Sequence, residues 1–256
     1  MKKLMIINAM ILIIVFPAFS DGTPGLQFTL INNGTSYEVS KGIVTDGEVI
    51  IPSVYQGKPV TQIAREGFQY TDITSVAGPV IIIIGDNAFN QCLRLTSVSF
   101  PNANSIGRGA FSETRMVSLS FPNVNSIGES AFAASSNLEN IDIPLVTSIN
   151  DYAFVNCAKL ERIYVPLATS IGNDAFRSCS SMTELNIPAV VRIGDWAFYD
   201  CDNLTSITIS YGISSSNFSD KNHSTRFMLF RTYYFEKGKL HNTYLWQNNA
   251  WTGPWL

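Results

Sequence analysis

A short motif that recurs every 21 or 22 residues constrains the fold of this chain more than any other feature. Its clearest copy runs from Ile84 to Pro101 and reads I-G-D-N-A-F-N-Q-C-L-R-L-T-S-V-S-F-P. The phenylalanine of this motif recurs at Phe68, Phe89, Phe111, Phe132, Phe154, Phe176 and Phe198. Self-similarity at a fixed period of roughly 20 to 50 residues indicates a solenoid in which each repeat forms one coil. We therefore expect the seven phenylalanines to stack in a file.

Each repeat has one half with helical spacing and one half with strand spacing. Ala88, Phe89 and Cys92 lie at i, i+1 and i+4, which predicts a short helical turn. The alternating segment that ends at Phe100 predicts a β-strand, and the proline that follows stops its ladder. A glycine such as Gly85 is expected to permit the turn into the helical half, and Asn150, which replaces it in one copy, also tolerates left-handed geometry.

The sequence divides into four segments. Residues 1–20 begin with Lys2 and Lys3, continue with an apolar run and end with small residues around Phe19, which predicts a cleaved export signal. The alternative is an uncleaved anchor, although the run is short for a span of ~20 residues. Residues 21–62 are expected to form an N-terminal β cap, residues 63–209 a solenoid of seven repeats, and residues 210–256 a C-terminal aromatic-rich cap. No transmembrane span is expected after signal cleavage.

Both caps are expected to be rich in β-structure. Leu26 to Ile31 and Tyr37 to Val39 flank an Asn-Asn-Gly sequence, which predicts a hairpin with a positive-φ turn. Phe227 to Phe235 and Leu240 to Trp246 are expected to form two strands that cover the last repeat. The alternative for the aromatic residues of this segment is a ligand platform, for instance for sugars.

Composition and motifs argue against several classes of function. The formal net charge is −3 and there is no basic run, so we expect no nucleic-acid partner. His223 and His241 are the only histidines, and neither a nucleophile elbow nor a phosphate-binding loop occurs. Carboxylates such as Asp86 and Asp151 stand at turn positions, where capping and solvation explain them. We expect no enzymatic activity and no cofactor.

The four cysteines share one position, three residues after the repeated phenylalanine. Thr114 and Ser135 fill the same position in other repeats, which indicates a small buried slot. Side chains that point the same way in a ladder make poor disulfides, and the paired spacing and histidines of a metal site are missing. We therefore expect free, packed thiols and no metal at Cys92, Cys157, Cys179 and Cys201.

The strand halves of the repeats are expected to form one continuous sheet face, on which residues before and after the central apolar residue point outward. Small hydroxyl side chains occupy the ends of this face. The middle of the face carries Asn140, Asp142, Arg162, Tyr164, Glu184 and Asn186. We expect these six residues to contact a protein partner, because tyrosine and arginine are typical interface anchors. The alternative is that Arg162 and Glu184 form a cross-strand charge pair on a solvated sheet.

The motif resembles the leucine-rich repeats of the BspA-like (Treponema pallidum-type) family of bacterial surface proteins. The resemblance covers about Val49 to Ile209, and it includes the replacement of the usual ladder asparagine by small apolar residues. The resemblance implies an α/β repeat fold: a right-handed leucine-rich-repeat solenoid with short helical turns and a parallel β-sheet. It also implies an exported protein, displayed or released, that binds host matrix or other cell-surface proteins. The family has no catalytic residues to transfer.

Two hypotheses about function follow. In the first, a secreted or cell-surface monomer acts as a protein-binding or adhesion module through the sheet face. In the second, the chain is a carbohydrate-binding or structural cell-envelope protein that uses its aromatic C-terminal region.

Overall fold

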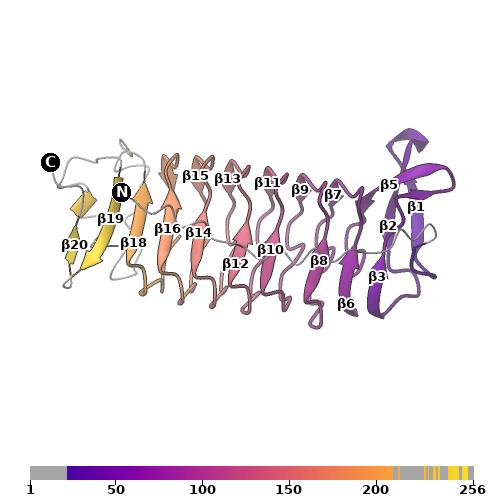
Figure 1. Cartoon of the computed structure of the whole chain (residues 1–256), viewed down its shortest axis with the longest axis horizontal. Helices are drawn as coiled ribbons and strands as arrows, with labels where there is room; N and C mark the ends of the chain where they lie inside the picture. Colours follow the sequence, from indigo (N-terminus) through magenta and orange to yellow (C-terminus); the bar gives the residue numbers. More distant parts are fainter. Residues whose placement is uncertain are drawn as a thin grey trace, which may run out of the picture.

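The computed structural model describes residues 22–209, 213, 228, 230, 233, 234, 236, 242–247 and 250–252. In this part of the chain, successive coils stack into one elongated row (Figure 1). The expected export signal, residues 1–20, lies outside the described residues.

Each coil contributes one short strand to each of two ladders. The first ladder contains β2 (Ser36–Ser40), β5 (Lys58–Ile63), β7 (Ile83–Ile84), β9 (Ser105–Ile106), β11 (Ser126–Ile127), β13 (Ser148–Ile149), β15 (Ser170–Ile171) and β17 (Arg192–Ile193). The second ladder contains β3 (Asp46–Ile50), β6 (Asp72–Ala77), β8 (Ser97–Ser99), β10 (Ser118–Ser120), β12 (Asn140–Asp142), β14 (Arg162–Tyr164), β16 (Glu184–Ile187) and β18 (Ser206–Ile209). The strands that pair within each ladder are parallel, and a first coil built from β2 and β3 precedes the seven repeats. Pairing is interrupted between β11 and β13 in the first ladder, and between β8 and β10 and between β12 and β14 in the second.

The third side of each coil is built from turns, so the predicted helical turn is wrong. Residues 22–209 contain no α-helix. The Ala88 N–H donates to the Gly85 carbonyl and the Cys92 N–H to the Phe89 carbonyl, closing two β-turns. Asn87 and Gln91 have φ of 53° and 56° at the third position of these turns, as a type II turn requires.

The turns replace a helix because they leave N–H groups free to bond the next coil. The Phe89 N–H donates to the Ala110 carbonyl at 2.8 Å, and the Phe132 N–H donates to the Ala153 carbonyl at 2.9 Å. An α-helix would satisfy these groups within its own segment and would not link the coils.

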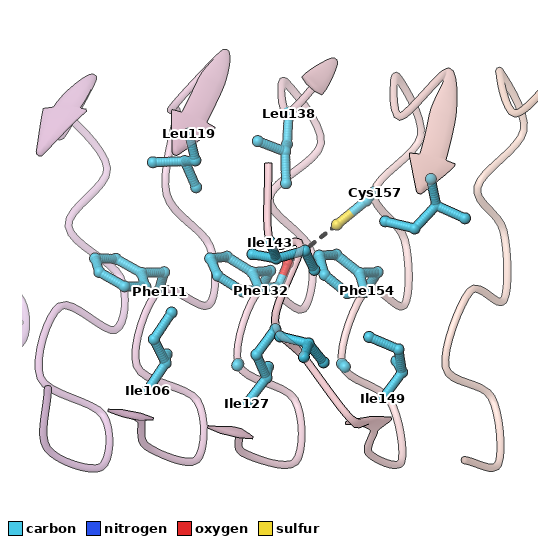
Figure 2. Packing of buried hydrophobic residues seen from close by; sticks show 14 of the residues in the cluster. Ile106, Phe111, Leu119, Ile127, Phe132, Leu138, Ile143, Ile149, Phe154 and Cys157 are labelled. Carbon is cyan, nitrogen blue, oxygen red and sulfur yellow. Dashed lines mark hydrogen bonds between the residues drawn. The ribbon is translucent and has the colours of Figure 1, made fainter. Parts of the chain in front are cut away.

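The seven repeated phenylalanines form the centre of the core, as predicted. All seven are fully buried, and neighbouring ring centroids are separated by 5.2 to 5.6 Å with nearly parallel planes. Figure 2 shows Phe111, Phe132 and Phe154 in this file, with isoleucines of the first ladder on one side and leucines on the other. This offset stacking adds to the burial of apolar area.

The glycine at the start of each turn is required for a reason other than the expected left-handed backbone. Gly85 and its equivalents do not have positive φ, and neither does Asn150. A Cβ atom on Gly85 would lie 2.7 Å from the Ile63 carbonyl oxygen of the preceding coil. Close approach between coils therefore selects glycine at this corner.

Asn150 replaces this glycine and marks a seam in the solenoid. The Gly172 N–H donates to the Ile149 carbonyl at 2.8 Å, whereas at the preceding corner the Asn150 side-chain Nδ2 donates to the Ile127 carbonyl at 2.8 Å. At this coil boundary β11 does not pair with β13, and β12 does not pair with β14. The hydrogen bonds of the turn side and the phenylalanine file continue across it.

Additional strands cover both ends of the row. At the N-terminal end, β1 (Gln27–Ile31) pairs antiparallel with β2 through the 3-10 turn η1 (Asn32–Gly34), which is the predicted hairpin. The short β4 (Val54–Tyr55) forms a hairpin with β5. At the other end, β19 (Asn242–Gln247) pairs antiparallel with β18, and β20 (Ala250–Thr252) pairs with β19.

The predicted strand from Phe227 to Phe235 is wrong wherever the structure describes it. Met228, Phe230, Tyr233, Tyr234 and Glu236 are α-helical. Phe230 and Tyr234 are both fully buried, with ring centroids 5.8 Å apart. This i, i+4 spacing places the two rings on one helical face. The many aromatic residues around them hide this spacing in the sequence.

The slot that follows each phenylalanine holds a small hydrogen-bond donor. The Cys157 Sγ donates to the Phe132 carbonyl of the preceding coil at 3.1 Å, as Figure 2 shows. The Ser135 Oγ donates to the Phe111 carbonyl in the same way at 2.8 Å. All four cysteines are buried and free, as predicted.

The positive-φ turn position gives a first prediction. Replacing Ala134, which has φ of 57°, with glycine is expected to raise the free energy of unfolding by about 0.5–1 kcal/mol, because glycine adopts this conformation without steric cost. Ala133→Gly is the matched control, since Ala133 is not at positive φ, and it is expected to lower stability by a similar amount. Urea denaturation measures both changes, and a loss in both variants would contradict the prediction.

The donor slot gives a second prediction. Cys157→Ser keeps the donor and is expected to change the free energy of unfolding by less than about 1 kcal/mol. Cys157→Val removes the donor and adds a methyl group to a fully packed slot, so a loss of about 1–3 kcal/mol is expected. Denaturant titration compares the two variants. An equal loss would show that sulfur packing, rather than donation, determines the residue.

Candidate functional site

The structure places the six predicted partner-contact residues on three successive coils of the second ladder, and together we call them the central patch. Asn140 and Asp142 lie on β12, Arg162 and Tyr164 on β14, and Glu184 and Asn186 on β16. Five of the six are exposed, and Asn186 is half-buried. Tyr164 is 56% exposed.

The register of the central patch agrees with the prediction on one side only. On β14 and β16, Arg162 lies opposite Glu184 and Tyr164 opposite Asn186. β12 pairs with β10 and does not pair with β14, so the expected continuous sheet is interrupted within the patch. The patch therefore crosses the seam at Asn150, with β12 and β14 neighbours in the row (Figure 1).

The alternative of a cross-strand charge pair is not formed: Arg162 and Glu184 lie opposite each other, but their side chains make no ion pair. The described residues contain two ion pairs, Arg65–Glu66 and Arg177–Asp174, and neither involves the patch. Both side chains of this alternative pair extend into solvent from exposed strand positions, where an isolated ion pair gains little. The Arg162 guanidinium is therefore free to meet a partner.

The structure also has a polar groove that the sequence analysis missed. It has a volume of about 280 Å³ and lies where the first ladder turns into the turn side. Its lining is formed by Ile149, Asn150, Asp151, Ser170, Ile171, Gly172, Asn173, Arg192 and Gly194.

A relay of side-chain to backbone hydrogen bonds runs beside this groove. The Asp151 Oδ1 accepts the Asn173 N–H at 2.7 Å, and the Asn173 Oδ1 accepts the Asp195 N–H at 2.8 Å. The Asp86 Oδ1 accepts the Arg108 N–H at 2.8 Å in an earlier coil. Asp86 and Asp151, for which the sequence predicts local capping, therefore link one coil to the next. The sequence does mark these residues, because each directly follows the corner residue of its repeat.

Burial keeps the ionisable core groups neutral. Desolvation raises the pKa of the Cys157 thiol to about 12, and it also raises the pKa values of Cys179 and Cys201. Desolvation raises the pKa of Tyr244 to about 12. Because the thiolate is the reactive form of cysteine, these thiols are poor nucleophiles near neutral pH.

In the part of the chain that the structure describes, no three His, Cys, Asp or Glu side chains gather in a way that could hold a metal ion. Nor does any helix there have the length and apolarity needed to cross a membrane.

Two solved structures resemble this fold. The leucine rich repeat protein of Treponema pallidum is 23% identical, with a TM-score of 0.63, over 71% of this chain and 90% of that one. A leucine rich cell surface protein of Faecalibacterium prausnitzii is 24% identical, with a TM-score of 0.53, over 89% of this chain and 58% of that one. At these identities the likeness concerns the fold.

Sequence comparison gives the family. No curated protein matches the chain. Residues 61–180 and 147–249 match the family model described as a BspA type leucine rich repeat region, in six copies. Since these matches extend over most of the sequence and the coils are those of a leucine-rich-repeat solenoid, the chain belongs to the BspA type leucine-rich repeat proteins.

Proposed function

We propose that this chain is an exported adhesion module that binds a protein partner, a host matrix or other cell-surface protein, through the central patch. One observation carries the proposal: Arg162 and Tyr164 are both exposed on the same strand, β14. Arg162 forms no ion pair with any of the described residues. The likeness to a leucine rich cell surface protein supports a location at the surface or outside the cell.

The arrangement suits a protein interface better than a small-molecule site. In-register strands ~4.8 Å apart present the side chains of β14 and β16 as a flat, ordered array. Tyrosine and arginine contribute disproportionately to binding energy at such surfaces. Ser118 and Ser120 on β10 are small, so a partner can approach closely beside the larger residues.

The charges of the central patch define the partner further. Asp142 and Glu184 provide two carboxylates, and Arg162 provides one cation. A partner with basic or amide groups around an aromatic contact complements this arrangement, and electrostatic complementarity mainly raises specificity and the association rate.

The aromatic C-terminal region supports the second hypothesis less well. The described rings of Phe230, Tyr234, Tyr244 and Trp251 are buried, and those of Tyr244 and Trp251 lie 5.3 and 5.4 Å from Phe230. These rings therefore pack against one another in the interior. Trp255 lies outside the described residues.

The proposal is tested by surface plasmon resonance with the mature chain over immobilised collagen, laminin and fibronectin. The double variant Arg162→Ala/Tyr164→Ala is expected to weaken binding to a recognised matrix protein at least ten-fold, because it removes two anchor side chains. Ser97→Ala/Ser99→Ala, on β8 of the same ladder, is the matched control and should change affinity less than two-fold. Unchanged affinity of the Arg162/Tyr164 variant, or no binding to any of the three proteins, would overturn the proposal.

A further inference from the structure

We propose that the polar groove above Gly172 and Gly194, together with the aromatic side chains of Tyr152 and Trp196, binds a neutral saccharide. This site lies at the corner between the first ladder and the turn side, whereas the central patch lies on the second ladder. It is therefore separate from the proposed protein-binding surface and independent of it.

The shape of the groove follows from the corner column of glycines. Gly172 and Gly194 contribute no side chains, and any Cβ atom on them would clash with the backbone of the preceding coil. Asn150, in the same column, adds a side chain at one end of the groove. Backbone therefore forms the base of the groove, and polar side chains form its ends.

The groove offers unused donors and acceptors. Among the described residues, the Arg192 guanidinium and the Ser170 hydroxyl have neither an ion pair nor a side-chain hydrogen bond. The Asn150 Nδ2 is used by the Ile127 carbonyl, which leaves its Oδ1 to accept. The Asp151 Oδ2 has one contact, with the Asn173 Nδ2 at 3.3 Å.

This mixture of groups selects the class of ligand. Hydroxyl groups both donate and accept, so a polyhydroxylated molecule matches a groove that holds free donors beside free acceptors. The Asp151 carboxylate in the lining opposes an anionic ligand and offsets the charge of Arg192, because like charges in a site are unfavourable. A metal ion is disfavoured, because the described residues contain no cluster of three suitable ligands. A neutral sugar satisfies all three conditions.

Two exposed aromatic residues directly follow residues of the relay in the sequence. Tyr152 follows Asp151, Trp196 follows Asp195, and both occupy the same turn position, with φ of 58° and 52°. The two residues are 40% and 39% exposed. The backbone does not need an aromatic residue there, since Gly109 holds the equivalent place in another coil.

The spacing of these aromatic residues suits a ligand longer than one ring. The Tyr152 N–H bonds the Asn173 carbonyl at 2.9 Å, and the Asp174 N–H bonds the Asp195 carbonyl at 2.8 Å, so the three coils are in step. Two coil spacings separate the aromatic positions by roughly 10 Å. The short Asp174 lies between them, with its side chain 4% exposed and paired to Arg177 at 3.3 Å. Exposed aromatic rings accept the apolar C–H face of a sugar while polar neighbours bind its hydroxyls.

The test is affinity electrophoresis of the mature chain in gels that contain laminarin, mannan or galactan, with anionic alginate in a parallel gel. At least one neutral polysaccharide is expected to retard the wild-type protein. Trp196→Ala is expected to weaken that retardation at least five-fold, and Trp196→Phe is expected to retain most of it. Tyr70→Ala is the matched control, because Tyr70 is also exposed at a positive-φ turn position, and it should migrate as wild type does.

Asn150→Gly keeps the test decisive if Trp196→Ala does not fold. It introduces the residue that five other corners carry and removes the Asn150 acceptor, so retardation should fall while the circular dichroism spectrum is retained. The Arg162→Ala/Tyr164→Ala variant should be retarded as strongly as wild type, which separates this site from the central patch. Absence of retardation by all three neutral polysaccharides, retardation by alginate alone, or full retardation of Asn150→Gly would overturn the inference.

Discussion

Hydrogen bonding between successive coils is the interaction on which the rest of this structure depends. Two strand ladders and one turn side direct backbone N–H groups along the long axis toward carbonyl groups of the neighbouring coil. A single coil cannot satisfy these groups by itself, so stability comes from stacking identical units. The phenylalanine file lies at the centre of the same stack, where buried rings stabilise the spacing that the hydrogen bonds impose.

This constraint explains why certain positions accept so few residue types. Five corners hold glycine because the neighbouring backbone would lie within 3 Å of a Cβ atom at those positions. The slot after phenylalanine accepts cysteine, serine or threonine because each is small and donates a hydrogen bond to a buried carbonyl. Contacts between coils therefore determine the residues of the motif more than the structure within one coil does.

Much of the architecture could be predicted from the sequence, because the period and the alternation report directly on burial. The phenylalanine file, the short parallel strands and the exposed positions of Arg162 and Tyr164 follow from that pattern. The helical turn did not, because a spacing of i, i+1 and i+4 states which side chains are buried, and two consecutive turns bury the same ones. The polar groove and the Asp151–Asn173–Asp195 relay were missed because they join residues from different coils, and the repeat pattern alone does not show which oxygen meets which N–H.

The seam at Asn150 has a mechanical consequence. Both strand ladders are interrupted between the same two coils, where each ladder side keeps only a long backbone hydrogen bond, from the Thr147 N–H to the Asn125 carbonyl at 3.5 Å and from the Glu161 N–H to the Glu139 carbonyl at 3.3 Å. The turn side and the aromatic file continue through that boundary unchanged. Bending of the rod should therefore concentrate there, as it does at the weakest joint of any chain of nearest-neighbour contacts. The central patch spans this joint. A ligand that contacts β12 and β14 together would therefore have to fix the angle between the coils before the joint and the coils after it. Immobilising the joint would then cost part of the binding free energy. A change that makes the joint rigid before binding would therefore raise the affinity without adding a contact.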